Sequence, residues 1–430
     1  MRKTFSDVQA QDDAPAWLQA LGGVPVATLV ERYGTPLLVL DTDRLRLAAD
    51  AILNVSRPLG LEVAYAAKAF FCVALAKLLA GMDIGLDVCS LGELVTAERA
   101  GFPIERLTLH GCGKTRDELA AAAGGRVGRI VVDGREELEA LASLAPGASG
   151  VAVLLRINSG VVAATHDLVR TAGDDTKFGF SPTEVPEAAA RIRETPHLRL
   201  LGLHAHVGSQ VFDPATFCAH AEAALLAYSR VRGLGFPLGE LVLGGGFGVA
   251  DLPPDDDADV GAILSALVAT VERSAAARNV PLPRLGIEPG RALVGRAGTT
   301  LYRVLAVKTR GSRRFAIVDG GVYENPRPAL YGSYHHPVLA ARASSAALIE
   351  TTVCGRSCEN DELATARLPH DIVAGDVLAL QMTGAYTFSM ASNYNRFVRP
   401  AAVFAGGLSH RLVIRRETEE DVLRQDVLAG

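Results

Sequence analysis

One lysine of this chain lies in an unusual place for a charged residue. Lys68 occurs in the run Tyr65-Ala-Ala-Lys68-Ala-Phe70, one of the most apolar stretches of the sequence. A bare ammonium buried there is costly, so the side chain must either extend to solvent or be used chemically. A Schiff base with an aldehyde cofactor is the chemical use, because it makes the amine a covalent catalyst. For a lone lysine, extension to solvent is the favoured alternative.

Two glycine-containing motifs suggest partners for such chemistry. Gly244-Gly-Gly-Phe-Gly248 follows a short apolar run and could bring backbone N–H groups close to a phosphate. It lacks the strand–GxGxxG–helix context of a dinucleotide site, so the phosphate would belong to a ligand smaller than NAD. Glu288-Pro-Gly-Arg291 holds a carboxylate that could keep a heteroaromatic nitrogen protonated. An exposed ion pair is the alternative for this motif taken alone.

The elements that must position these residues repeat along the first two thirds of the chain. Eight short apolar runs alternate with stretches of helical spacing, such as Glu93–Ala100, Arg116–Ala123 and Arg135–Leu144. Strands that are apolar on both faces predict parallel pairing, and eight such units can close a (β/α)8 barrel. An open doubly wound sheet is the alternative. The eight runs are Val63–Ala67, Leu86–Cys89, Leu107–His110, Arg129–Val132, Val151–Ile157, Leu200–His206, Leu241–Leu243 and Leu285–Glu288.

Polar residues gather at one end of these predicted strands. In a (β/α)8 barrel, chemistry takes place at the C-terminal ends of the strands. The strand interiors are apolar, so the contrast between interior and end is a functional signal. The residues at the ends are Lys68, Asp87, Ser90, His110, Arg156, Asn158, His204, His206, 244–248 and 288–291.

The last third of the chain has a different pattern, which predicts a separate β domain. Short strand-like runs are separated there by Gly, Pro and Asp turns, and we expect Pro36–Asp41 to pair with them. The sequence therefore predicts an N-terminal segment over residues 1–44 that joins the β domain, a barrel over 45–295 and a C-terminal β domain over 296–430. The strand-like runs are Tyr302–Lys308, Arg314–Val318, Ile349–Val353, Val377–Leu380 and Ala401–Phe404.

Composition excludes several classes of protein. The chain has 430 residues, is 49% hydrophobic and carries a formal net charge of −5, which excludes a mainly disordered chain and argues against nucleic acid as a partner. No run of eighteen apolar residues occurs, so we expect no membrane span. Six scattered cysteines indicate a reducing, cytoplasmic location rather than a disulfide framework. Without HExxH or CxxC spacing we expect no metal site.

Taken together, the motifs carry a family resemblance from about Thr35 to Pro400. The chain resembles the fold-type III pyridoxal-phosphate-dependent decarboxylases, most closely the diaminopimelate decarboxylase family. The resemblance implies an alanine-racemase-like (β/α)8 barrel, a C-terminal β-sandwich or β-barrel domain, and a homodimer with shared active sites. The matching stretches are 65–70, Asp87–Glu93, Lys177–Phe180, His206-Val-Gly-Ser-Gln210, Gly244–Gly248, Glu288–Arg291, Arg327–Tyr331, Cys358-Glu359, Gly384-Ala-Tyr386 and Phe388–Asn395.

The resemblance implies pyridoxal 5'-phosphate as the cofactor and assigns residues to it. Lys68 would hold its aldehyde carbon as a Schiff base. His206 would stack on the ring, and Glu288 would pair with the pyridine nitrogen. The residues implied around the phosphate are Ser209, Gly246 to Gly248, Gly290, Arg291 and Tyr386.

The same resemblance implies decarboxylation of meso-2,6-diaminopimelate to L-lysine and CO2. Cys358 would reach in from a second subunit as the proton donor, and Glu359 would pair with the distal ammonium of the substrate. The residues implied for substrate binding are Arg291, Arg327, Tyr331, Glu359 and Tyr386. A planar Arg fork gives a carboxylate the bidentate contact that it prefers.

The chain also departs from the family pattern near the implied substrate pocket. Asn360-Asp361-Glu362 stands where Ser-Gly-Asp is usual, and Gly111-Cys-Gly-Lys114 where Gly-Asn-Asn-Lys is common. A decarboxylase of another amino acid, free or tethered to a carrier protein, is therefore the alternative activity. A catalytically silent homologue is a third hypothesis, disfavoured because both Lys68 and Cys358 are present.

Overall fold

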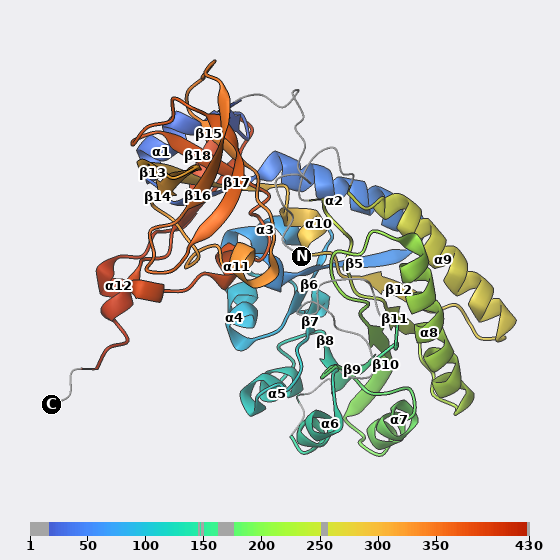
Figure 1. Cartoon of the computed structure of the whole chain (residues 1–430). Coiled ribbons are helices and arrows are strands. Elements are labelled where there is room, and N and C mark those ends of the chain that lie inside the picture. Colours follow the sequence, from blue (N-terminus) through green and yellow to red (C-terminus); the bar gives the residue numbers. More distant parts are fainter. Residues whose placement is uncertain (1–16, 145–146, 148–149, 162–175, 251–256, 428–430) are drawn as a thin grey trace. The chain divides into compact units, whose positions relative to one another are not determined.

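The computed structural model describes residues 17–144, 147, 150–161, 176–250 and 257–427. These residues form two compact units (Figure 1). One unit holds the described residues of 49–249 and 257–292, and the other holds those up to 48, residue 250 and residues 293–427.

The first unit is a closed barrel of eight parallel strands, in the order β10-β11-β12-β5-β6-β7-β8-β9. All eight predicted runs are strands, so the (β/α)8 prediction is confirmed and the open sheet is excluded. Helices surround the barrel on its outside (Figure 1). The strands are β5 (Leu61–Ala66), β6 (Gly85–Val88), β7 (Leu107–Leu109), β8 (Arg129–Val132), β9 (Val151–Ile157), β10 (Leu198–Ala205), β11 (Glu240–Val242) and β12 (Arg284–Ile287).

Helices α4, α5, α8 and α9 of the barrel begin at residues whose side chains cap them. Ser90 accepts a hydrogen bond from Glu93 N at the start of α4, and Thr115 forms a capping box with Glu118 at the start of α5. These caps determine where the preceding βα loops end. They therefore help to hold the loops that carry the strand-end residues. The helices are α2 (Thr42–Ser56), α3 (Val73–Ala80), α4 (Leu91–Ala100), α5 (Arg116–Ala123), α6 (Arg135–Ala142), α7 (Val185–Arg193), α8 (Pro214–Gly233), α9 (Val260–Ala277) and α10 (Arg291–Val294), with 3₁₀ turns η2 (Ala67–Ala69) and η3 (Ile104–Arg106).

Helix α9 is long and apolar enough to cross a membrane by length and composition alone, although the sequence has no run of eighteen apolar residues and therefore predicts no span. Its buried face includes Ile263, Leu264 and Leu267, and the helix runs beside α8 on the barrel (Figure 1). The core helix of a barrel has the same apolar face, because it must cover the outer side of apolar strands. Packing in the barrel therefore accounts for its composition.

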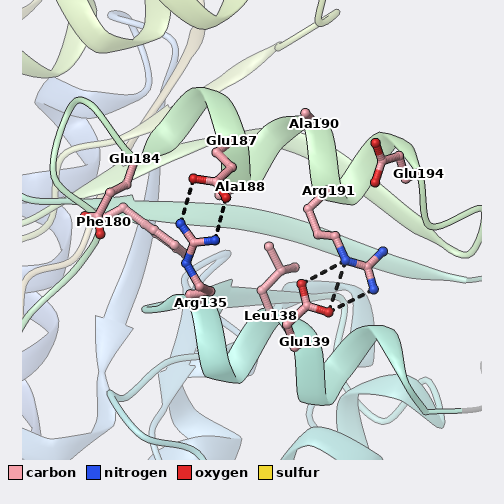
Figure 2. Close-up of a pocket in the computed structure, with 10 residues that line it drawn as sticks. All are labelled: Arg135, Leu138, Glu139, Phe180, Glu184, Glu187, Ala188, Ala190, Arg191 and Glu194. Carbon is pink, nitrogen blue, oxygen red and sulfur yellow. Dashed lines mark hydrogen bonds and ion pairs between the residues drawn. The ribbon is translucent and has the colours of Figure 1, made fainter.

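Helices α6 and α7 are joined across a shallow surface groove by two ion pairs (Figure 2). Arg135 contacts both carboxylate oxygens of Glu187 at 2.5 and 2.6 Å, and Arg191 binds Glu139 through Nε and a terminal nitrogen at 2.8 and 2.9 Å. The four side chains are exposed, so solvent screens these pairs and they contribute little to stability.

The second unit is built on a mixed ten-stranded sheet. Strand β4 pairs with β13 and β19, so the segment before the barrel is part of this sheet. The strands are β1 (Trp17–Leu18), β4 (Leu37–Asp41), β13 (Gly298–Arg310), β14 (Arg313–Val318), β15 (Pro337–Ala340), β16 (Leu348–Cys354), β17 (Glu362–Pro369), β18 (Val377–Gln381), β19 (Ala401–Gly406) and β20 (Ser409–Ile414). A small hairpin and short helices complete the unit: β2 (Ala20–Leu21), β3 (Val24–Pro25), α1 (Val26–Tyr33), α11 (Arg327–Tyr331), η5 (Phe388–Met390), η6 (Tyr394–Arg396) and α12 (Glu419–Leu423).

Neighbouring residues of this sheet belong to two different cores. On β13, Leu301 belongs to one hydrophobic cluster and Tyr302 to another. On β18, Ala379 and Leu378 divide in the same way. Successive side chains of a strand point to opposite faces, so the sheet is buried on both sides. The predicted separate β domain is confirmed.

Candidate active site

The carboxylate of Glu288 lies between two histidines at the C-terminal ends of the barrel strands. Its Oε1 is 3.0 Å from His110 Nε2, and its Oε2 is 3.0 Å from His204 Nε2. His110 Nε2 is also 3.6 Å from Asp87 Oδ1. Four strands, β6, β7, β10 and β12, thus deliver one side chain each to a cluster that is almost wholly buried.

Electrostatic interactions within this cluster fix its charges. Burial alone would lower the pKa of His110, but the carboxylates of Glu288 and Asp87 outweigh it and raise that pKa to about 9. Burial opposes ionisation of Glu288, yet the two histidines hold its pKa well below the usual value. Burial lowers the pKa of His204 to about 4 and, with the charge of Glu288, raises that of Asp87 to about 6. At neutral pH the cluster therefore contains ionised Glu288, cationic His110 and neutral His204.

Lys68 and His206 face the same region of the barrel mouth. Lys68 follows β5 in η2 and is exposed in this structure, as expected for a lysine that extends from an apolar run to solvent. Burial, and then the charges of Lys68 and Arg156, hold the pKa of His206 well below its ordinary value. The imidazole is therefore neutral, and its half-buried ring can lie against an apolar or aromatic ligand face.

Three loops that carry predicted site residues are held together by backbone hydrogen bonds. Val211 N and O bond Gly246 O and Gly248 N at 2.9 Å, which joins the loop of Ser209 to the glycine turn. Glu288 N donates to Gly244 O at 2.9 Å, and Ala66 N donates to Pro289 O at 3.2 Å. The structure thus brings the ends of β5, β10, β11 and β12 together at one mouth, beside the buried Gly290 and the half-buried Arg291.

Glycine is required in the turn after β11 because neighbouring loops approach its backbone. A Cβ at Gly244 would lie 2.5 Å from His206 Nδ1. Gly246 has φ +103°, and a Cβ there would overlap Gly208 O. Phe247 stacks on Phe217 of α8 with ring centroids 5.2 Å apart, which anchors the turn. The turn is therefore a rigid backbone surface of the kind that accommodates a phosphate.

Lys114 and Glu137 support this mouth without having been predicted to do so. Lys114 Nζ donates to Gly111 O at 2.7 Å, Val131 O at 2.6 Å and Glu137 Oε1 at 2.8 Å. Both side chains are buried. The pair ties the loop after β7, which follows His110, to β8. The only sign of this ion pair in the sequence is a lysine directly after a Gly-Cys-Gly turn. Its partner Glu137 lies 23 residues further along the chain, so no local spacing links the two.

The second unit carries an arginine enclosed by two tyrosines. The guanidinium carbon of Arg327, a buried residue of α11, is 4.7 Å from the ring centroid of Tyr331 and 5.5 Å from that of Tyr386. Its NH2 also donates to Ser333 Oγ at 3.2 Å. Three of the residues predicted for substrate binding are therefore brought together, while Arg291 belongs to the barrel unit.

Cys358 and Glu359 lie on a different, exposed loop of the second unit. Cys358 N donates to Asn395 Oδ1 at 3.2 Å, and Tyr394 Oη donates to Glu359 Oε1 at 2.6 Å. The base of the loop is fixed by the buried Asp361, which accepts from Val322 N at 2.6 Å and from Ser357 N at 3.2 Å. Asp361, in the stretch that differs from the family pattern, is thus a structural anchor of this loop.

Comparison with known proteins identifies the class that this barrel and its strand-end residues define. Residues 47–295 match the family model for the pyridoxal-binding domain of pyridoxal-dependent decarboxylases. The chain is 47% identical over 412 residues to diaminopimelate decarboxylase of Actinosynnema pretiosum subsp. auranticum. This alignment covers 95% of this chain and 92% of that protein. It is also 40% identical over 416 residues to the diaminopimelate decarboxylase of Bacillus subtilis (strain 168). This alignment covers 95% of this chain and 94% of the Bacillus protein. The chain therefore belongs to the pyridoxal-dependent decarboxylases and, within them, to the diaminopimelate decarboxylase family.

Solved structures agree with this assignment. Diaminopimelate decarboxylase from M. jannaschii in co-complex with L-lysine has a TM-score of 0.87 at 27% identity, covering 94% of this chain and 95% of that chain. The enzyme from Helicobacter pylori complexed with L-lysine has a TM-score of 0.85 at 26% identity, covering 93% and 98%. The predicted fold class and the predicted family are confirmed.

The barrel mouth fits pyridoxal 5'-phosphate, the cofactor of this family. It offers an amine for the aldehyde, an ionised carboxylate for the ring nitrogen, a neutral imidazole for the ring face and a glycine turn for the phosphate. His110, His204 and Glu288 also offer ligand atoms within 4.8 Å of one another, a spacing that a metal ion could use. The expectation of no metal stays a prediction.

Proposed function

We propose that this protein decarboxylates meso-2,6-diaminopimelate to L-lysine and CO2. The observation that carries the proposal is identity of 40–47% over 95% of the chain to diaminopimelate decarboxylases. The Lys68, His206 and Glu288 arrangement supports the chemistry, and the enclosed Arg327 supports a substrate with a second carboxylate.

The residues of the barrel act on the cofactor. When bound, pyridoxal phosphate supplies an electron-accepting ring for the electron pair released as the carboxylate leaves. Lys68 would hold the aldehyde carbon, and His206 would lie against the ring. Ionised Glu288, which His110 and His204 keep in place, would hold a proton on the pyridine nitrogen. Ser209, Gly246 and the turn at Gly290 would surround the phosphate.

Residues of the second unit would supply specificity and a proton. Arg327, with Tyr331 and Tyr386 packed against its guanidinium, would bind the distal carboxylate of the substrate, and the family pattern makes Arg291 a further candidate for it. Glu359 would pair with the distal ammonium. Cys358 would donate a proton to the carbon that has lost its carboxylate. A cation and an anion at the far end of the site would favour a substrate with a distal carboxylate and a distal ammonium over an amino acid that has only the distal amine.

A substrate panel tests this proposal against decarboxylation of another amino acid. We expect kcat/KM for meso-diaminopimelate to exceed that for L-lysine, L-ornithine and L-arginine by about 10³-fold or more, because these leave the Arg327 guanidinium without its carboxylate. Arg327→Lys keeps the charge but loses the fork, so it should raise KM for meso-diaminopimelate more than it lowers kcat. Faster turnover of ornithine or lysine would overturn the proposed substrate.

We also infer a cytoplasmic homodimer in which Cys358 of the partner subunit completes each site. The six cysteines are free thiols, which supports a reducing location. Inactive Lys68→Ala and Cys358→Ala variants, mixed and allowed to exchange subunits, should regain about a quarter of the wild-type sites. Proven exchange without recovery of turnover would contradict the shared site.

A further inference from the structure

The loop of Cys358 and Glu359 depends on a second exposed segment. We define the cysteine loop as residues 356–361 and the support turn as residues 393–397. The support turn holds the tip of the cysteine loop at two points, through Asn395 to Cys358 N and through Tyr394 to Glu359. Both segments are largely exposed, so these two hydrogen bonds, rather than burial, determine where the tip lies.

The two segments also share an anchor in the core of the second unit. The guanidinium carbon of Arg356 is 4.4 Å from the ring centroid of Phe397. That ring lies 4.7 Å from the ring of the buried Tyr323. Ser392 N, just before the support turn, donates to Tyr323 O at 2.7 Å. The base of each segment is therefore fixed in the second unit, and the two tips contact each other through the Asn395 and Tyr394 hydrogen bonds.

The backbone of the support turn adopts a conformation that needs external support. Asn395 and Arg396 have φ values of 53° and 59°. Two consecutive non-glycine residues in the left-handed region are disfavoured, although Asn tolerates it better than most residues. The side chain of Asn395 is directed at Cys358 N by this conformation.

A C-terminal strap, residues 417–426, supplies that support. Glu417 accepts from Asn393 Nδ2 at 2.7 Å and from Arg399 N at 2.9 Å. Arg396 reaches Asp426 Oδ2 at 2.6 Å and Val422 O at 3.3 Å. The strap therefore binds the first residue of the support turn, one of its two left-handed residues, and Arg399 just beyond its end.

We infer that Tyr394 and Asn395 are positioning residues for Glu359 and Cys358, and that the C-terminal strap keeps them in place. This inference rests on the proposed function, because it gives the two positioned groups their roles. Asn395 fixes the backbone from which the Cys358 thiol projects, and so affects proton donation. Tyr394 orients the Glu359 carboxylate, and so affects recognition of the distal ammonium.

Substitutions that change one contact at a time test the inference. Asn395→Gly keeps the left-handed backbone and deletes the amide, while Asn395→Asp keeps an acceptor oxygen. We expect Asn395→Gly to lower kcat about two- to tenfold with little change in KM, and Tyr394→Phe to raise KM for meso-diaminopimelate by a similar factor with little change in kcat, the range given by losing one hydrogen bond. Asn395→Asp should restore most of kcat.

A second readout separates this inference from the proposed activity. In the holoenzyme, the alkylation rate of Cys358 by iodoacetamide is measured by peptide mass spectrometry, with an added free-cysteine peptide as internal reference. Asn395→Gly and Glu417→Ala should each raise the Cys358 rate severalfold relative to that peptide. Asp371→Asn, which breaks an exposed ion pair with Arg342 elsewhere in the same unit, is the control and should leave it unchanged.

The outcomes are distinct. Wild-type alkylation rates in both Asn395→Gly and Glu417→Ala would overturn the inference, as would an Asn395→Asp variant as damaged as Asn395→Gly. If wild-type protein does not turn over meso-diaminopimelate, the proposed function fails, but the alkylation rates still decide whether the support turn positions Cys358.

Discussion

The barrel mouth and the cysteine loop solve the problem of placing reactive groups in opposite ways. In the barrel, Glu288 is held by two imidazoles at 3.0 Å within a buried cluster whose charges are set by mutual interaction. On the loop, exposed Cys358 and Glu359 are held by single hydrogen bonds from an equally exposed turn. The first arrangement gives fixed electrostatics in a low dielectric. The second arrangement is more easily displaced, because each group is held by a single exposed hydrogen bond.

The largest effect is expected at Lys68, because no neighbouring side chain can replace its amine. Lys68→Ala should lower turnover by roughly 10⁴- to 10⁶-fold, the scale seen when a covalent catalyst is removed. Lys68→Arg keeps the positive charge that acts on His206 but cannot bond the aldehyde, so it should be equally inactive. Turnover and visible absorbance of the bound cofactor are the measurements. An Arg variant with substantial activity would show that only the charge matters.

The buried cluster should make stability depend on pH. The pKa of His110 in the folded protein is about 9, above its ordinary value of 6.5. A group whose pKa is raised on folding stabilises the protein below its unfolded pKa, and this contribution is lost as pH rises from 6.5 through 9. The loss should be on the order of 3 kcal/mol. Urea denaturation of the cofactor-free protein across this range measures it.

His110→Asn is the matched variant for that experiment. It removes the titrating group while retaining a hydrogen-bonding side chain beside Glu288. The variant should be less stable than wild type at pH 6.5, and the difference should shrink toward pH 9. An identical pH dependence in both proteins would mean that the cluster is not held by the charge of His110.

A smaller effect is expected at the base of the cysteine loop. Asp361→Ala removes the acceptor for Val322 N and Ser357 N, which should cost about 1–3 kcal/mol in the free energy of unfolding. Asp361→Asn keeps one acceptor oxygen and should lose less. Thermal melting of the two variants compares them. Equal stability of Asp361→Ala and wild type would show that the loop needs no anchor at its base.

The smallest effect is expected on the outer face of the barrel. Arg135→Ala breaks the exposed pair with Glu187 shown in Figure 2, and solvent already screens that pair. We expect no measurable change in melting temperature or turnover. A clear loss of stability would show that this exposed ion pair contributes as a buried one does, which would contradict the difference drawn between the two regions.

The sequence predicted the barrel well because its strands are apolar on both faces. β8 and β9 have the predicted bounds, Arg129–Val132 and Val151–Ile157. Six strands of the second unit were not predicted: the short β1, β2 and β3, and also β15, β17 and β20. β20 has no fully buried residue and begins with the polar Ser409-His410-Arg411, β15 is short and begins with Pro337, and β17 mixes polar and apolar residues. Such strands are defined by their partners rather than by their own pattern.

The site was predictable in its members but not in its contacts. The strand-end rule placed His110, His204 and Glu288 at the same mouth, yet nothing in the sequence indicates that one carboxylate lies 3.0 Å from both imidazoles. The support of Cys358 by Asn395 joins two irregular segments 37 residues apart. No periodicity or motif spacing reports such a contact, so only the three-dimensional structure reveals it.

The most direct test of the central claim is a product balance on the purified, cofactor-loaded protein given meso-2,6-diaminopimelate. We predict one L-lysine and one CO2 for each substrate consumed, and no turnover with Lys68→Ala. A protein that binds the cofactor through Lys68 but releases no CO2 from meso-diaminopimelate would contradict the proposed function.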